Sequence, residues 1–146
     1  MIRAATLFAV LLATPASADP LPINPDVTQA TIGATICRSG WTRTIRPAHG
    51  RMRRIKREML RAANEPRSRA SAYQLDHRIP LTLGGSPMAR ENIALQPINE
   101  ARAKDAIETC LSQAVCRHAI ALRAAQAAIQ TDWRAAAKFC TLNGDR

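Results

Sequence analysis

An aspartate and a histidine stand side by side in this chain, and their side chains suit the two tasks of metal-assisted hydrolysis. Asp76 can hold a hard cation through its carboxylate oxygens, and His77 can take a proton from water near neutral pH. For each residue alone a structural role is the alternative. Asp76 can pair with Arg78 or Lys104 at the surface, and His77 can be a partly buried histidine. The order of the residues that follow favours chemistry.

Short elements around this pair are expected to hold it in place. Residues 72–75 predict a strand that enters the pair, and the alternating Ile79, Leu81 and Leu83 predict that the chain leaves it as the strand of a hairpin. Gly84-Gly85 permits a reversal of the chain. Residues 93–95 predict a second strand, and residues 100–113 predict a helix. Its packing face is expected to carry Ala103, Ile107, Cys110 and Leu111.

The core Asp76-His77-x-Ile-Pro-Leu-x-x-Gly-Gly85, in the order strand, turn, strand and helix, resembles the HNH family of the His-Me finger (ββα-metal) nucleases. The likeness is strongest over residues 73–108. It implies that Asp76 is a metal ligand and that His77 is the general base that activates water. It also implies that Asn92 pins the loop and orients the imidazole, and that Lys104 lies near the phosphate.

One position departs from the family pattern. HNH proteins commonly offer a second protein ligand from the start of the helix, and this chain has Ala101 there. Asn99 and Asp105 are the neighbouring residues that can complete the site, and the choice between them stays open. One or two carboxylates with waters and substrate phosphate can hold Mg²⁺. The resemblance therefore implies a divalent cation, Mg²⁺ first and Mn²⁺ or Zn²⁺ as alternatives, while Ala101 leaves room for a degenerate, inactive member.

A strong excess of positive charge indicates a polyanionic partner. The 146 residues include 21 Lys and Arg against 11 Asp and Glu, for a net charge of +10 and a pI near 10.9. Much of the excess lies in the arginine-rich stretch 43–69. Within it Ile55 and Met59, with Met52 and Ala62, recur at helical spacing, so one side can pack while the other carries cations. A solvated helix face is the alternative, and the narrow, aromatic-free apolar stripe disfavours a membrane surface. The expected nucleic-acid contacts are Arg51, Arg53, Arg54, Lys56, Arg57 and Arg78.

The N-terminus indicates export. Arg3 precedes an apolar run, and Ala16-Ser17-Ala18 is the small-x-small pattern of a signal-peptide cleavage site, so residues 1–18 are expected to be a signal peptide. The run is short for a bilayer span, although an uncleaved anchor is the alternative. A periplasmic or secreted protein without stable membrane association is expected. Residues 19–35 predict an extended arm, and residues 36–146 a single HNH-like domain with its finger at about 72–113.

Four cysteines in an exported chain predict two disulfides. Cys110 and Cys116 are about 9 Å apart on a continuous helix at 1.5 Å per residue, beyond the reach of one bridge. Cys37 and Cys140 are therefore expected to be their partners. The resemblance implies the pairs Cys37–Cys116 and Cys110–Cys140, and a zinc site is the alternative, although no Cys-x-x-Cys is present.

The alanine-rich C-terminal third predicts a helical scaffold that closes over the finger. Its apolar side is expected to carry Ile120, Leu122, Ala125, Ile129 and Trp133, and its solvent side Gln126, Gln130 and Arg134.

The sequence predicts a mostly helical α+β protein with two disulfides, and the resemblance implies that a ββα-metal finger packs on its N- and C-terminal helices. The expected function is a metal-dependent endonuclease that cuts DNA with little sequence selectivity. A catalytically degenerate envelope protein that binds nucleic acid or another polyanion is the alternative.

Overall fold

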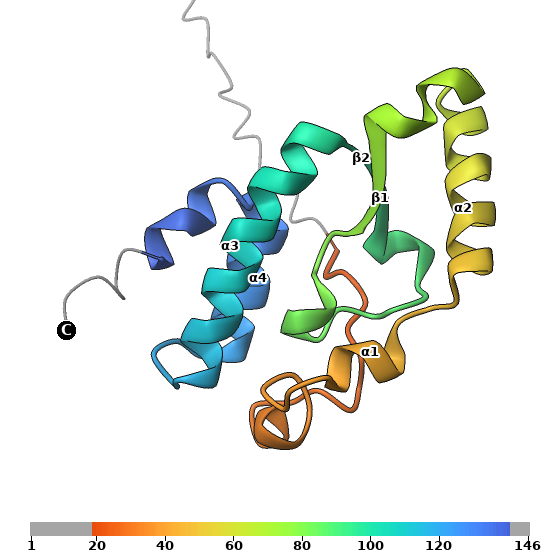
Figure 1. Cartoon of the computed structure of the whole chain (residues 1–146). Coiled ribbons are helices and arrows are strands. Elements are labelled where there is room, and N and C mark those ends of the chain that lie inside the picture. The colour runs from red at the N-terminus through yellow and green to blue at the C-terminus, as the bar shows by residue number, and fades with distance from the viewer. Residues whose placement is uncertain (1–18, 141–146) are drawn as a thin grey trace, which may run out of the picture.

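The computed structural model describes residues 19–140 of the chain (Figure 1). The signal peptide expected over residues 1–18 lies outside the described residues. The fold is α+β and mostly helical, as expected, with a single two-stranded sheet in the described part. Its helices and strands are η1 (Ile32–Ala34), α1 (Trp41–Ile45), α2 (His49–Ala62), η2 (Arg67–Ala72), β1 (Tyr73–His77), η3 (Leu81–Leu83), η4 (Arg90–Asn92), β2 (Ile93–Pro97), α3 (Ile98–Cys116), α4 (Leu122–Asp132) and η5 (Ala135–Phe139), where η marks a 3-10 helix.

The two strands form an antiparallel pair that stands between α2 on one side and α3 with α4 on the other (Figure 1). Asp76 pairs with Ala94 and His77 with Ile93, so the candidate residues lie at the last two positions of β1. Both expected strands are confirmed.

The prediction of a strand over Ile79, Leu81 and Leu83 was wrong. The backbone there forms η3 instead, with the Leu83 N–H bonded to the Pro80 carbonyl at 2.9 Å and the Gly85 N–H to the same carbonyl at 3.0 Å. Pro80 has no N–H to give to a strand ladder, and its carbonyl is already used by this turn. All three apolar side chains are nonetheless buried.

Helix α3 is longer than expected, and the face that it buries differs from the expected one. Its buried residues are Ala101, Lys104, Leu111, Ala114 and Val115, whereas Ala103 is exposed. The packing face therefore runs through position 104, and the expectation that Ala103 packs was wrong. The physical reason is a tertiary ion pair: the ammonium of Lys104 turns toward Asp76 on β1.

Residues 19–35 pack against the rest of the domain. Val27 and Ile32 are buried in the main apolar core, together with residues of η3, α3 and α4. The N–H of Asn24 donates to the Gly84 carbonyl at 2.8 Å, and Ile23 forms a β-bridge with Gly85. The segment contains a β-bridge, turns and η1 rather than running as a free extended arm.

Helix α4 covers the same core, with one polar exception. Gln126 was expected to face solvent, yet it is buried and donates from Nε2 to the Leu83 carbonyl at 2.9 Å. That carbonyl belongs to η3, which was not expected. The buried Leu83 carbonyl needs a hydrogen-bond donor, and Gln126 supplies it, but the spacing of residues along α4 does not indicate this contact.

Two disulfides join the N- and C-terminal parts to α3. Cys37 bonds Cys116 and Cys110 bonds Cys140, with Cα–Cα distances of 5.5 and 5.6 Å. The pairing implied by the resemblance is confirmed. Each bridge in a small domain contributes about 2–5 kcal/mol, and their presence indicates an oxidising, non-cytoplasmic compartment. Across residues 19–140, no helix has both the length and the apolar character needed to cross a bilayer.

Candidate functional site

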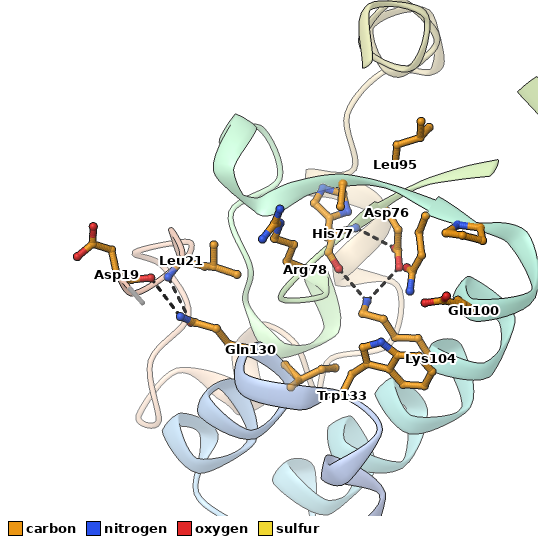
Figure 2. A pocket seen from close by; sticks show the side chains of 14 residues that line it. Asp19, Leu21, Asp76, His77, Arg78, Leu95, Glu100, Lys104, Gln130 and Trp133 are labelled. Carbon is orange, nitrogen blue, oxygen red and sulfur yellow. Dashed lines mark hydrogen bonds and ion pairs between the residues drawn. The ribbon is translucent and has the colours of Figure 1, made fainter. Parts of the chain in front are cut away.

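The end of β1 opens on a pocket of about 360 Å³ between the sheet, α3 and the region of α4 (Figure 2). Its lining includes four candidate residues, Asp76, His77, Arg78 and Lys104, together with Glu100 and Trp133, which the sequence did not place in the site. β1 supplies Asp76 and His77, the residue directly after it is Arg78, and α3 supplies Glu100 and Lys104.

Lys104 is the most tightly held side chain of this site. Its ammonium nitrogen lies 3.0 Å from Asp76 Oδ2 and 2.8 Å from the carbonyl oxygen of His77, and it also donates to Glu108 Oε1 (Figure 2 shows the first two bonds). Only 4% of its side-chain surface is exposed, against 14% for Asp76. The sequence left a surface ion pair as the alternative for Asp76, and the structure has a buried pair with Lys104.

Opposing effects set the ionisation of this cluster. Burial works to lower the pKa of Lys104, but the negative charges of Glu108 and Asp76 outweigh it and the pKa is raised, so the ammonium stays charged. For Glu108, burial raises the pKa to about 7, against the attraction of Lys104, and the charge of Asp76 adds to the rise. The cluster therefore holds one firm cation, Lys104, and a carboxyl at Glu108 whose pKa is raised toward neutral pH.

The imidazole of His77 is fixed and neutral. Its Nε2 lies 3.1 Å from the Pro87 carbonyl oxygen, and since a carbonyl only accepts, Nε2 carries the proton and Nδ1 keeps its lone pair. Burial lowers the pKa of His77, outweighing the bond to Pro87 and the charge of Asp76, which raise it, and Arg46 and Lys104 lower it further. A neutral imidazole at physiological pH is the form that a general base requires.

Asp76 and His77 face opposite sides of the sheet. Successive side chains of a strand alternate in direction, and Asp76 turns toward Lys104 of α3 while the His77 ring bonds the loop carbonyl of Pro87. The link between them runs through the backbone: Asp76 Oδ1 accepts the His77 N–H at 2.8 Å, and Lys104 bonds the His77 carbonyl. Because they are neighbours in the sequence, the Asp76 and His77 side chains lie at the same end of β1 but on opposite faces of the sheet.

Asn92 holds the loop that connects β1 to β2. It is fully buried, accepts the Ile79 N–H at Oδ1 (2.8 Å), and donates from Nδ2 to the carbonyls of Ile79 (3.0 Å) and Ser86 (2.9 Å). Its own carbonyl accepts the Arg78 N–H at 2.7 Å. Asn92 therefore fixes the backbone directly after His77, whereas the imidazole ring is held by its hydrogen bond to the Pro87 carbonyl.

The two residues expected as a second metal ligand lie away from the pocket. Asn99 and Asp105 are both exposed on α3 and neither belongs to the pocket lining. Within residues 19–140, no three His, Cys, Asp or Glu side chains gather in a group that could hold a metal ion. The oxygens that do converge are Asp76 Oδ2, the His77 carbonyl and Glu108, around the ammonium of Lys104.

The cationic residues of α2 lie on the other side of the hairpin from α3 (Figure 1). Arg51, Arg53, Arg54 and Arg57 are exposed, and Arg54 pairs with Glu58 at 3.3 Å. Lys56 instead donates to the Tyr73 carbonyl at 2.7 Å and anchors α2 to the start of β1. Arg78 is exposed at the rim of the pocket, with no ion-pair partner within 4.0 Å among the described residues.

Two groups of the site, Glu108 and the carbonyl of Pro87, escaped the sequence interpretation, and Arg46 was expected only as part of the basic stretch 43–69. Glu108 follows Lys104 by four residues, and this helical spacing was a usable signal for an ion pair. A loop carbonyl carries no such signal, and the basic stretch did not indicate which of its arginines lies near His77. Comparisons of the chain with protein-family models, with curated proteins and with solved structures find no match.

Proposed function

We propose that this protein is a metal-dependent endonuclease that hydrolyses phosphodiester bonds of DNA with little sequence selectivity. The observation that carries the proposal is the imidazole of His77, which is neutral, fixed by the Pro87 carbonyl and placed one residue from Asp76 at the end of β1. A positioned neutral base beside cationic side chains is what attack of water on a phosphodiester requires.

The residues divide the reaction as follows. Nδ1 of His77 accepts a proton from water as the water oxygen bonds to phosphorus. The bond from phosphorus to the leaving oxygen breaks, and that oxygen takes up a proton from solvent. Arg78 and Arg46 are the nearby guanidinium groups that suit the phosphate oxygens. Asp76 would hold the divalent cation, with the His77 carbonyl and Glu108 as further oxygen donors of the kind that Mg²⁺ and Mn²⁺ prefer. When bound, such a cation supplies charge stabilisation at the leaving oxygen.

The charge of α2 supports a nucleic-acid partner. We expect the triple replacement of Arg53, Arg54 and Arg57 by Gln to flatten the dependence of duplex affinity on salt, by up to about 0.9 in the log–log slope per lost phosphate contact. A fluorescence-anisotropy titration of a labelled duplex at several salt concentrations measures this slope. Duplexes of unrelated sequence should behave alike, since these contacts are to the backbone.

A matched variant separates local contacts from net charge. Arg102, Arg117 and Arg123 are exposed on or next to α3 and α4, and their joint replacement by Gln removes the same charge elsewhere. We expect that variant to keep most of the wild-type slope. Equal slopes for both triple variants would mean that α2 is not the binding surface.

A second function has its own observation. The ammonium of Lys104 already satisfies Asp76, the carboxylate that a catalytic cation would need. A protein that keeps this scaffold and binds nucleic acid or another polyanion through α2, without cleaving it, is therefore the competing proposal. In either case we propose a periplasmic or secreted location, which the two disulfides support.

Plasmid nicking decides between the two functions. Disulfide-intact protein should convert supercoiled plasmid to the nicked form with Mg²⁺ or Mn²⁺, and EDTA should stop the reaction. If the protein cuts neither DNA nor RNA with Mg²⁺, Mn²⁺ or Zn²⁺ while it still retards a duplex, the binding function replaces the nuclease.

A further inference from the structure

The ammonium of Lys104 stands where three oxygen donors converge. Lys has three N–H donors, and the structure provides three acceptors: Asp76 Oδ2, the His77 carbonyl oxygen and Glu108 Oε1. They come from the end of β1 and from α3, and Lys104 is almost fully buried among them. A positive charge is thus bound by oxygens alone, which is the environment that hard divalent cations take in proteins.

We propose that Lys104 is a built-in cation occupying a divalent-metal site, so that its ammonium and a bound metal ion exclude one another. The site would consist of Asp76, the His77 carbonyl and Glu108. The proposal deepens the proposed function and rests on it for its catalytic meaning, because it makes displacement of Lys104 the condition for loading a metal.

The geometry supports mutual exclusion. Asp76 Oδ1 is bonded to the His77 N–H at 2.8 Å, so Oδ2 is the oxygen left for a cation, and Oδ2 is the atom that contacts Lys104. A metal ion bound to the same oxygen would lie within a few ångströms of the ammonium, and like charges at that separation in a buried site repel strongly. Lys104 lines the pocket, so the site that it occupies borders this space.

Removal of the positive charge at position 104 should allow a divalent metal ion to bind at Asp76 and Glu108. In Lys104→Met, which keeps most of the side-chain volume, we expect one Mn²⁺ per chain to bind at least about tenfold more tightly than in the wild type, because the competing charge is gone. Isothermal titration calorimetry, or the electron paramagnetic resonance signal of free Mn²⁺, measures the affinity without any nuclease assay. Adding Asp76→Asn to Lys104→Met should abolish the gain.

Arg102→Met is the matched control. It removes one positive charge from an exposed position of the same helix, and its Mn²⁺ affinity should stay at the wild-type value. An equal gain in Arg102→Met would show that net charge, and not this site, governs the binding. Lys104→Met with wild-type affinity would overturn the inference.

Folding must be checked as well, because Lys104→Met leaves the largely buried carboxyl groups of Asp76 and Glu108 without their cation. Lys104→Gln keeps N–H donors for Asp76 and Glu108 and serves as the second variant. Thermal unfolding of both should show a midpoint that rises with Mn²⁺, while the wild type shows a much smaller rise, since a ligand that binds the folded state stabilises it. If Mn²⁺ stabilises neither variant, or restores neither to the folded state, the inference is wrong.

Mn²⁺ binding and plasmid nicking together distinguish a failure of this inference from a failure of the nuclease proposal. Tight Mn²⁺ binding in the Lys104 variants together with no plasmid nicking by any form would leave the metal site standing and remove the nuclease. Metal-dependent nicking by the wild type, with Lys104 variants that bind Mn²⁺ no better than it does, would keep the nuclease and remove the role of Lys104.

Discussion

Replacing His77 by alanine is expected to slow plasmid nicking by about 100-fold or more, the usual contribution of a positioned general base. The reason is that the described strand end offers one neutral imidazole with a fixed proton on Nε2 and a lone pair on Nδ1. Duplex affinity should change little, because the cationic residues of α2 are untouched. Initial rates of nicking, with anisotropy for binding, measure the two effects separately.

His49→Ala is the control for this prediction. His49 is exposed at the first position of α2 and does not line the pocket, so its loss should leave the nicking rate unchanged. Because His77 is buried, its variant must be shown by thermal unfolding and by thiol titration to be folded with both disulfides formed. A folded His77→Ala protein that nicks at the wild-type rate would place the base elsewhere.

Replacing Gly85 by alanine is expected to destabilise the fold by more than about 4 kcal/mol, enough to unfold much of a domain whose total stability is typically 5–15 kcal/mol. A Cβ at this position would lie 1.8 Å from the Ile79 carbonyl oxygen and 2.7 Å from Asn92 Nδ2. Neither atom can move freely, since Asn92 donates to that carbonyl and to the carbonyl of Ser86. Urea unfolding followed by circular dichroism measures the loss.

Gly50→Ala provides the comparison, because a Cβ at Gly50 in α2 meets nothing within 4 Å. Alanine is the better helix former, so this variant should be unchanged or more stable by up to about 1 kcal/mol. Similar urea midpoints for the two variants would contradict the close approach of Gly85 to Ile79. A selective loss in Gly85→Ala would confirm that the loop after His77 is closed by backbone contact.

The parts of the fold that depend on local patterns were predictable from the sequence. Alternating and helical spacing of apolar residues located β1, β2 and α2, and the cysteine separation excluded one disulfide pairing. The same reasoning failed at residues 81–83, where apolar alternation suited a strand but Pro80 began a tight turn. It also failed at Ala103 and Gln126, whose directions depend on what packs against their helices.

The sequence by itself determined the fold class, the strand that ends in Asp76 and His77, and the charge of α2, because each follows from residues that are near neighbours in the chain. Only the tertiary structure decided how those groups are used. It brought Lys104, which is 28 residues from Asp76, into contact with three oxygen acceptors. It also directed the His77 side chain to the opposite face of the sheet and left Asn99 and Asp105 exposed. The physical reason is that burial, pKa and the balance of buried charges are properties of contacts between distant elements, and periodicity along the chain carries no information about which of them meet.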